Sequence, residues 1–232
     1  MNNLSHNSPV RRGKVIAIDG PAGSGKSTTA KIVAERLGYT YLDTGAMYRA
    51  LTYYALENKI IPSDEKKLAE IAEQLLLEFR RKDGGNLVYL NGQNISSKIR
   101  TPEVTKNVSE VSAHLLVRKV MVAKQKEFGK NGSLVAEGRD TTTVVFPDAD
   151  LKIYMDASVK ERARRKLLDL SNMGIESDLS AQEQEINRRD EFDSEREHSP
   201  LTRAEDAVVI DTTNLTIEKQ VDRIVELFQA AR

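Results

Sequence analysis

The chain of 232 residues contains no cysteine. This absence excludes disulfide bonds, zinc held by thiolates and a cysteine nucleophile. The sequence also lacks an apolar run near the ~20 residues that a membrane-spanning helix needs. Its first residues lack the apolar segment of a secretory signal. We therefore expect a soluble, cytoplasmic protein with no membrane partner, and a short disordered arm over residues 1–13.

A net charge is missing as well, because 35 Lys and Arg residues balance 35 Asp and Glu residues. Proteins dedicated to nucleic acids or to membrane surfaces usually carry a net basic charge, so we expect no nucleic-acid partner. No feature of the sequence indicates a stable oligomer, and we expect a monomer. A chain of this length is sufficient for one α/β domain with an insertion.

The most specific motif is the G-x-x-x-x-G-K-S pattern of residues 20–27. A short apolar, β-branched run precedes it at residues 15–18, and a helical pattern follows it and ends at Gly38. A strand, a glycine-rich loop and a helix N-terminus together direct backbone N–H groups and the helix dipole at a polyphosphate. The motif therefore predicts a nucleoside triphosphate site, with the lysine on the phosphates and Mg²⁺ on the Ser27 hydroxyl. The residues assigned to this site are Gly20, Pro21, Ala22, Gly23, Ser24, Gly25, Lys26, Ser27 and Thr28.

Four further apolar runs predict strands, at residues 39–42, 134–136, 151–155 and 207–210. Helical patterns lie between the predicted strands, and this order implies a parallel sheet with helices on both faces. In such sheets the ligand lies beyond the carboxyl ends of the strands. Acidic residues mark those ends and indicate where the site lies: Asp19, Asp43, Glu137, Asp156 and Asp211.

Residues 62–105 interrupt this alternation. Apolar residues at helical spacing predict an amphipathic helix over residues 65–80, with its apolar stripe in the core. Residues 86–95 contain Asn91-Gly92, the strongest short-range signal for a β-hairpin. A helix and a hairpin inserted between strands predict a small accessory domain.

The chemistry performed on the phosphates is indicated by arginine. A phosphate-binding loop occurs in switches, motors, hydrolases and kinases, and this sequence lacks the Asn/Thr-Lys-x-Asp motif that reads guanine. Hydrolysis needs about one stabilising arginine, whereas transfer to a phosphorylated acceptor brings two polyanions together and needs more. Transfer is favoured by the arginines that recur where loops should face the site: Arg49, Arg118, Arg139, Arg162, Arg165, Arg189 and Arg196.

Two segments with arginine faces predict a lid. The first begins a helix after Asp156, the second is the charged run at residues 188–198, and residues 171–174 predict a flexible connection. The alternative is that the charged run is an ordinary solvated helix face. The residues that a lid would turn toward the site are Arg162, Arg165, Arg189, Asp193 and Arg196.

Several segments of the chain resemble the bacterial cytidylate kinases, from about Lys14 onward. The resemblance implies ATP-dependent phosphorylation of CMP and dCMP, without a general base because the attacking phosphate oxygen is already anionic. The segments that carry it are residues 20–28, 42–49, 137–140, 143–149, 156–158, 161–165 and 189–196.

The resemblance also implies an architecture, that of an α/β P-loop kinase. The core, residues 14–61 and 106–232, would hold a five-stranded parallel sheet with helices on both faces. Residues 62–105 would form an inserted α+β domain that binds the nucleoside monophosphate. A short helical lid would lie at about residues 157–197.

Roles for individual residues follow from the resemblance. The monophosphate and its sugar would be held by Thr44, Tyr48 and Arg49. Cytosine would be read by Ser109, Arg118 and Asp140. The acceptor phosphate would be bound by Arg139, Arg189 and Arg196, and the ribose by Asp193. Transfer itself would depend on Lys26, Arg139, Arg162, Arg165 and Arg189.

Two local departures lead to structural expectations. Residues 141–143 are threonines, where relatives usually place a glycine at the second position. If that glycine takes a positive φ, Thr142 would be strained. Ser109 and Arg118 are nine residues apart, and at about 100° per residue they would face opposite sides of an unbroken helix. The resemblance implies that both read the same base, which requires a break between them, so we expect the helix to break near residues 113–116.

Two other functions remain open at this point. One is a kinase of a different small acceptor on the same fold, such as UMP, dTMP or shikimate. The other is a non-catalytic nucleotide sensor that signals through lid closure. Turnover across a panel of acceptors separates these functions.

Overall fold

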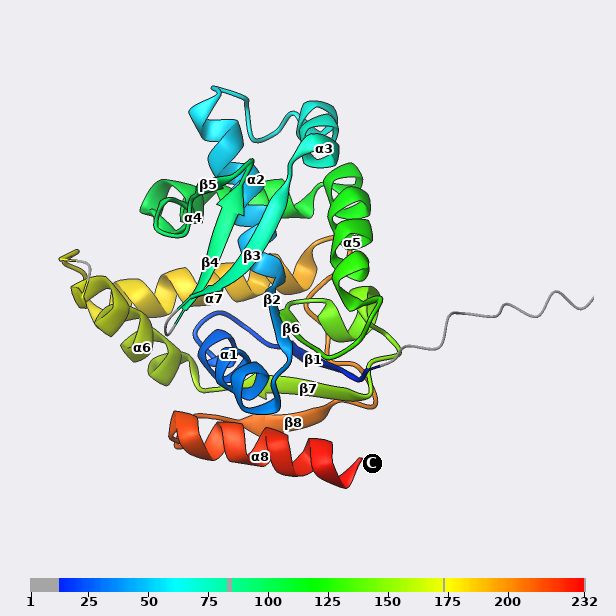
Figure 1. Ribbon diagram of the computed structural model, residues 1–232. Helices are drawn as coiled ribbons and strands as arrows, with labels where there is room; N and C mark the ends of the chain where they lie inside the picture. Colours follow the sequence, from blue (N-terminus) through cyan, green and yellow to red (C-terminus); the bar gives the residue numbers. More distant parts are fainter. Residues whose placement is uncertain (1–12, 83–84, 173, 232) are drawn as a thin grey trace, which may run out of the picture.

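The computed structural model describes residues 13–82, 85–172 and 174–231, so nearly all of the expected N-terminal arm lies outside the described residues. Five strands form a parallel sheet in the order β2-β6-β1-β7-β8 (Figure 1). The strands are β1 (Val15–Asp19), β2 (Thr40–Asp43), β6 (Leu134–Gly138), β7 (Leu151–Asp156) and β8 (Val208–Asp211). All five predicted strands are confirmed, and the acids at their carboxyl ends lie along one edge of the sheet.

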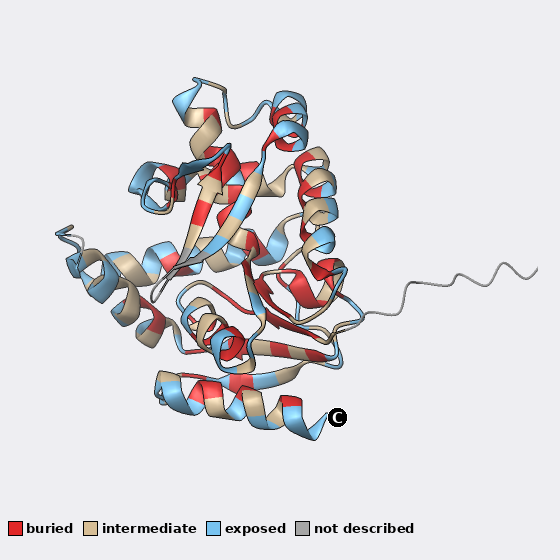
Figure 2. Cartoon of the chain, in the orientation of Figure 1, coloured by how far each residue is buried: buried red, intermediate tan, exposed pale blue. Residues whose placement is uncertain are grey.

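Helices cover both faces of this sheet, because successive side chains of a strand point to opposite sides. In β1, Ile16 and Ile18 pack with α1 and α8, whereas Val15 and Ala17 pack on the other side with α2 and α5. Every residue of β1 is buried (Figure 2). Burial of each large apolar side chain contributes about 1.5–3 kcal/mol to folding. The helices are α1 (Lys26–Leu37), α2 (Thr44–Glu57), α5 (Leu115–Gly129) and α8 (Ile217–Ala230).

A second, antiparallel sheet lies above the first in Figure 1, within the segment that interrupts the alternation. The segment contains α3 (Glu65–Gln74), β3 (Leu77–Lys82), β4 (Gly85–Leu90), β5 (Gln93–Asn94) and the short 3₁₀ helix η1 (Lys98–Arg100). The predicted hairpin is confirmed, since β4 and β5 meet at Asn91 and Gly92, both with positive φ. The separate domain predicted for residues 62–105 stays a prediction.

The helix predicted over residues 65–80 is wrong after Gln74. From Leu77 the chain alternates instead, with Leu77 and Phe79 packed on the core, while Leu76 is 68% exposed. Pairing with β4 satisfies the backbone of β3 and stabilises the extended form. Pairing with β4 thus makes this segment extended, although the local spacing of its apolar residues favours a helix.

The helix break between Ser109 and Arg118 is confirmed. Helix α4 (Pro102–Ala113) ends where His114 adopts an extended conformation, and α5 begins at the next residue. No proline is needed, because α3 supplies the cap: the backbone N–H of Leu116 donates to Glu65 Oε1 at 2.8 Å. The break brings Ser109 and Arg118 to the same cavity.

Thr142 is not strained, contrary to the conditional expectation. It lies in a single π-helical turn, η2 (Thr141–Val145), and is not among the described residues with positive φ. Buried Asp19 holds this turn, since its carboxylate accepts from the backbone N–H groups of Thr141 and Thr142 at 2.8 and 2.7 Å. The Thr142 hydroxyl donates to the same carboxylate at 2.6 Å. The threonine therefore adds a hydrogen bond that glycine lacks.

The two predicted lid segments are α6 (Val159–Asn172) and α7 (Leu179–Glu195), which pack against each other. The flexible connection was placed too early, because Ser171 and Asn172 continue α6. The described part of the connection begins at Gly174, which has a positive φ, and Asp178 caps α7. Met173 lies outside the described residues.

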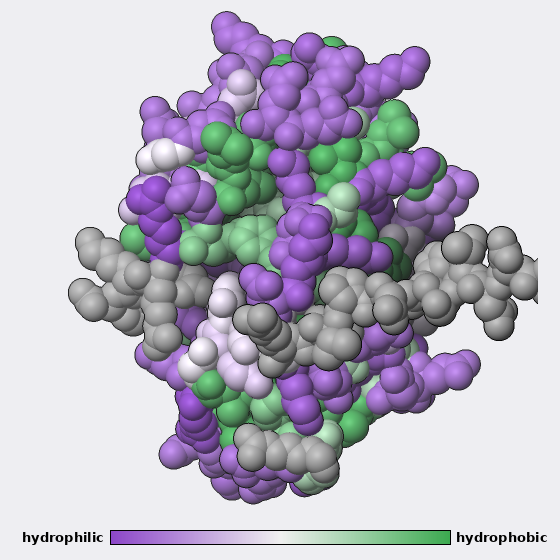
Figure 3. All heavy atoms as spheres, turned by 45° about the vertical axis from the view of Figure 1, so that its right-hand side comes forward, coloured by the Kyte–Doolittle hydropathy of each residue, from purple (hydrophilic) through white to green (hydrophobic). Residues whose placement is uncertain are grey.

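The surface is mostly hydrophilic on the face shown in Figure 3, with smaller hydrophobic patches. Across the described ranges, no helix is both long enough and apolar enough to cross a membrane.

Candidate functional site

The predicted phosphate loop connects β1 to α1, as the motif requires. Three of its glycines, Gly20, Gly23 and Gly25, have positive φ. A Cβ at Gly20 would lie 2.0 Å from the carbonyl oxygen of Met155, so only glycine fits there. The loop closes on itself through Lys26, whose Nζ donates to the carbonyl oxygen of Pro21 at 3.0 Å. Burial and the nearby Arg139 lower the pKa of Lys26.

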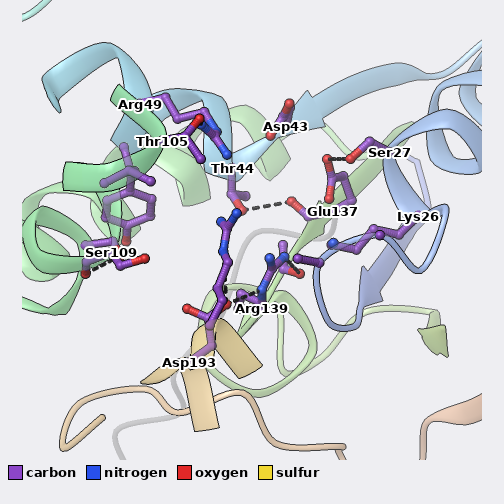
Figure 4. A pocket seen from close by; sticks show the side chains of 18 of the residues that line it. Lys26, Ser27, Asp43, Thr44, Arg49, Thr105, Ser109, Glu137, Arg139 and Asp193 are labelled. Atoms are coloured by element: carbon purple, nitrogen blue, oxygen red, sulfur yellow. Dashed lines mark hydrogen bonds and ion pairs between the residues drawn. The ribbon is translucent and has the colours of Figure 1, made fainter. Parts of the chain in front are cut away.

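A cavity of about 260 Å³ opens beyond the carboxyl ends of β1, β2 and β6 (Figure 4). Its lining comes from the phosphate loop and from α2, α4, α5, α6 and α7. Most of the predicted site residues line it: Ala22, Gly23, Lys26, Ser27, Thr44, Tyr48, Arg49, Ser109, Arg118, Arg139, Asp140, Arg165, Arg189, Asp193 and Arg196. The predicted residues that do not line it are Gly20, Pro21, Ser24, Gly25, Thr28 and Arg162.

One end of the cavity is a group of buried polar side chains, here called the Asp140 cluster: Tyr48, Ser109, Arg118, Asp140 and Arg196. Arg118 forms an ion pair with Asp140, and the two side chains are 3% and 5% exposed. Arg118 Nη1 also donates to the carbonyl oxygen of Ser112 at 2.9 Å, and its guanidinium lies 5.4 Å from the centre of the Tyr48 ring. Arg196 Nη2 lies 3.9 Å from the other carboxylate oxygen of Asp140. The carboxylate is thus held between two cations.

The Tyr48 hydroxyl is buried in this cluster beside the Gln125 side chain, and no hydrogen bond of standard geometry joins it to a described residue. Burial raises the pKa of Tyr48 to about 12, so the hydroxyl keeps its proton. A buried hydroxyl without a well-formed hydrogen bond is costly, and it is available to a ligand.

The other end gathers cations from four elements and is here called the Arg49 cluster: Arg49, Arg100, Arg139, Lys166 and Arg189. Within the described part of the chain, Arg49 has no carboxylate partner and donates only to the Thr105 hydroxyl, at 3.0 Å. Burial and Arg189 lower the pKa of Arg49 to about 10. Mutual repulsion of this kind is relieved by an anion.

Asp193 lies between the two ends and accepts from Arg139 Nε at 2.7 Å, while Arg189 Nε lies 3.9 Å away. Although burial opposes the effect, Arg139 and Arg189 lower the pKa of Asp193. Arg139 is therefore anchored by Asp193 and by a longer bond from its Nη1 to the carbonyl oxygen of Gly138 at 3.4 Å, and both Arg139 and Arg189 line the cavity.

The two α6 arginines assigned to the site from the sequence, Arg162 and Arg165, contact the phosphate loop. Arg162 lies outside the lining: its Nε donates to the carbonyl oxygen of Ala157 at 2.9 Å, and its Nη1 pairs with Asp190 at 2.6 Å. Arg165 donates to the carbonyl oxygens of Gly23 and Thr212, at 3.2 and 2.7 Å. Both arginines tie α6 to the loop, and only Arg165 also reaches the cavity.

Sequence reasoning missed several residues of the cavity. Glu137 accepts from the Ser27 hydroxyl at 2.6 Å, and burial and Asp43 raise the pKa of this carboxyl. Asp43 also lines the cavity. The sequence analysis noted Asp43 and Glu137 as acids at strand ends but assigned neither a role. Arg100 and Lys166 of the Arg49 cluster had no signal beyond their charge, because each depends on the packing of a distant element.

Comparison with known proteins gives consistent results. Residues 16–230 match the family model described as cytidylate kinase. The chain is 51% identical over 212 residues to the cytidylate kinase of Bacillus cereus strain ATCC 10987, with 91% of this chain and 94% of that protein covered. It is 52% identical over 210 residues to the cytidylate kinase of Bacillus anthracis strain CDC 684, with 90% and 93% covered. Among solved structures, an uncharacterized protein from Eubacterium ventriosum is similar in fold alone, with a TM-score of 0.51 and 11% identity over 94% of this chain and 99% of that one.

Proposed function

This chain belongs to the cytidylate kinase family, and we propose that it transfers the terminal phosphoryl group of ATP to CMP and dCMP. The observation that carries the proposal is that one cavity joins a phosphate loop, a group of cations and a buried Arg–Asp pair. These three features correspond to the donor phosphates, the acceptor phosphate and the acceptor base.

The donor would bind on the phosphate loop. Its backbone N–H groups and the N-terminus of α1 favour the β- and γ-phosphates, and Lys26 adds a charge at the cavity wall. The Arg165 guanidinium already lies beside the loop and lines the cavity, so it is suited to neutralise charge on the phosphoryl group in transfer. Arg162 is proposed to act with it by holding α6 against the loop.

The acceptor phosphate would bind in the Arg49 cluster. A phosphate dianion there would relieve the repulsion that lowers the pKa of Arg49. Arginine forks grip phosphate oxygens in pairs and keep their charge at every physiological pH. Thr44, at the start of α2, lines the same wall. We therefore assign the acceptor phosphate to Arg49, Arg139 and Arg189, with Thr44 beside them.

The acceptor base would bind in the Asp140 cluster, and the ribose beside Asp193. Cytosine offers a 4-amino donor where uracil offers a carbonyl acceptor. A carboxylate accepts from the first and repels the second, so Asp140 supports selection of cytosine. Ser109 and Arg118 come from opposite sides of the α4–α5 break and contribute the remaining polar groups. Arg196 and Tyr48 complete the wall.

Magnesium is included in this proposal, because the residues near Lys26 fit the ion. Mg²⁺ in such sites usually binds one or two protein oxygens together with phosphates and water. The Ser27 hydroxyl donates a hydrogen bond to Glu137, which leaves the lone pairs of the Ser27 oxygen for a cation. The described residues contain no group of three or more His, Cys, Asp or Glu side chains that could hold a metal ion by themselves. Bound there, Mg²⁺ would neutralise charge on the donor phosphates.

The residues perform positioning and charge neutralisation rather than proton transfer. The attacking oxygen of CMP is anionic near pH 7, so no general base is required. Holding the two phosphates in line removes much of the entropic barrier. Closure of α6 and α7 over the cavity would exclude water, which competes as an acceptor.

The decisive experiment measures ADP release with a panel of acceptors: CMP, dCMP, UMP, dTMP, AMP and shikimate. We expect turnover with CMP and dCMP at rates well above the others. Preference for another acceptor would reassign the base site, and release without any acceptor preference would indicate a nucleotide hydrolase. Saturable ATP binding with no turnover would favour the sensor. A Lys26→Ala preparation, purified in the same way, controls for contaminating kinases.

A further inference from the structure

A tyrosine outside the cavity lining contacts the Glu137 carboxylate from the side of the sheet. The Tyr41 hydroxyl donates to Glu137 Oε1 at 3.2 Å, and the same oxygen accepts from the Ser27 hydroxyl at 2.6 Å. The three residues come from β2, β6 and α1. Figure 4 shows the Ser27–Glu137 half of this arrangement at the wall of the cavity.

The register of the sheet explains why Tyr41 reaches this carboxylate. In the parallel pairing of β2 with β6, Tyr41 lies opposite Val135 and Asp43 lies opposite Glu137. Tyr41 and Glu137 are therefore diagonal neighbours on one face of the sheet, a separation that long side chains bridge. The contact depends on pairing between segments that are 96 residues apart in sequence.

Two donors on one oxygen fix the orientation of a carboxylate that would otherwise rotate. Glu137 is buried, and burial together with Asp43 raises the pKa of its carboxyl, while the bond from Ser27 acts in the opposite direction. Burial and Glu137 hold the pKa of Tyr41 well above its ordinary value, so the tyrosine stays a donor. The Tyr41 hydroxyl therefore donates a hydrogen bond to the same Glu137 oxygen that accepts the hydrogen bond of Ser27.

We propose that Tyr41 is a positioning residue for the metal site: its hydroxyl holds Glu137 Oε1 where that oxygen accepts the hydrogen bond of the Ser27 hydroxyl, so that the Ser27 oxygen presents its lone pairs to Mg²⁺. This inference rests on the magnesium role proposed above for Ser27. Tyr41 is not among the residues that line the cavity, and it acts through its bond to Glu137. Its effect should therefore appear in metal dependence.

A purely structural role for Tyr41 is separable, because its ring also packs against the apolar cluster on the α1 and α8 face. Tyr41→Phe keeps the ring and removes only the hydroxyl. Tyr39 provides a matched control, since it packs against the same cluster and its ring meets Phe228 edge-on at 5.8 Å. Tyr39→Phe removes one hydroxyl from the same segment without touching the Ser27–Glu137 pair.

The experiment compares wild type with four variants: Tyr41→Phe, Tyr39→Phe, Glu137→Gln and Ser27→Ala. One readout is the Mg²⁺ concentration that half-saturates turnover. The other is calorimetric: the ratio of ATP affinities with Mg²⁺ and with EDTA, measured without CMP. Loss of a partner to a metal ligand typically weakens metal binding about 10–100-fold. Tyr41 contacts the partner of the proposed metal ligand rather than the ligand itself, so we expect loss of its hydroxyl to change both readouts by about 3- to 10-fold. Thermal midpoints of unfolding are measured in parallel.

The outcomes distinguish this inference from the function on which it rests. The positioning role is supported if Tyr41→Phe and Glu137→Gln alter both readouts while Tyr39→Phe behaves like wild type. If Glu137→Gln alters both readouts and Tyr41→Phe alters neither, the inference is overturned and the metal assignment stands. If Glu137→Gln and Ser27→Ala both leave the metal dependence unchanged, the metal assignment is overturned together with the inference. If Tyr39→Phe and Tyr41→Phe change both readouts equally, the effect comes from packing, and the inference about Tyr41 is overturned.

Discussion

At the Asp140 cluster each buried charge has an opposite charge beside it, whereas at the Arg49 cluster cations gather with too few carboxylates to neutralise them. Arg118 and Asp140 pair within the wall, and Arg196 approaches from the far side. Arg49, in contrast, is left with a single hydroxyl partner among the described residues. The same cavity therefore combines an end where both cations face one carboxylate with a more electropositive end, where Arg49 has no carboxylate partner among the described residues.

The difference corresponds to two kinds of recognition. A prearranged, paired carboxylate discriminates between ligands by hydrogen-bond pattern, because a mismatched group leaves buried partners unsatisfied. Cations that outnumber their carboxylate partners bind any phosphate and discriminate little, but they supply charge where it develops in transfer. Changes in the Arg49 cluster and the phosphate loop should therefore affect rate, and changes in the Asp140 cluster should affect the choice of substrate.

Lys26→Ala should have the largest effect. Removal of a preorganised charge at the donor phosphates should lower kcat about 10²–10⁴-fold. The CMP to UMP preference of the remaining activity should not change, because Lys26 is remote from the Asp140 cluster. Steady-state kinetics with both acceptors measures this, and Lys26→Met, which keeps the apolar stem, controls for packing. A folded Lys26→Ala protein with near-wild-type kcat would remove the phosphate-loop assignment.

Arg189→Ala should come next. Loss of one acceptor-phosphate ligand should lower kcat/KM for CMP by about 100-fold, through a higher KM as well as a lower kcat. Arg165→Ala should instead lower kcat with a smaller change in KM, because Arg165 lies beside the phosphate loop, where the donor is proposed to bind. Arg188→Ala is the matched control, since Arg188 is exposed and pairs with Glu185. Equal kinetics for the Arg188 and Arg189 variants would show that α7 presents only a solvated face.

Asp140→Asn tests selectivity. The amide can accept from cytosine or, turned over, donate to uracil, and the charge that repels uracil is gone. The ratio of kcat/KM for CMP over UMP should narrow by about 10- to 100-fold, mostly through improvement with UMP. The asparagine keeps the shape and a partner for Arg118, so the fold should survive, as a thermal melt can verify. Proportional losses with both substrates would mean that Asp140 only braces Arg118.

Features that depend on residues close together in sequence could be predicted from the sequence alone. The phosphate loop, the five strands and the α4–α5 break follow from local patterns and helix geometry. Other features depend on contacts over long separations. Strand β3 was predicted as a helix because its partner β4 decides its conformation. Arg162 was predicted as a residue of the active centre, but the described structure places it on Asp190 and the loop backbone. The pairing of Tyr41 with Glu137 exists only once β2 and β6 are in register.

Asp193 joins the two ends of the cavity, and its contribution should be the smallest and dependent on pH. Arg139 and Arg189 lower its pKa in the folded protein below the unfolded value of about 3.9. The ion pair therefore contributes stability above that value and loses it as the pH falls through the folded-state pKa. Asp193→Asn keeps an acceptor oxygen for Arg139 but removes the charge, so at pH 7 it should lower the free energy of unfolding by about 1–2 kcal/mol.

The test is denaturant unfolding of wild type and Asp193→Asn at pH 7 and at pH 3. The difference in unfolding free energy between the two proteins should narrow at pH 3, because that pH lies below the unfolded pKa of about 3.9, so the unfolded wild-type chain binds a proton that the folded ion pair resists. Leu201 N donates to the backbone carbonyl of residue 193 at 2.7 Å, and that bond is common to both proteins, so it cancels in the comparison. A difference that stays the same at both pH values would show that the loss comes from packing. In that case the charge of Asp193 would not stabilise the junction between the Asp140 and Arg49 clusters.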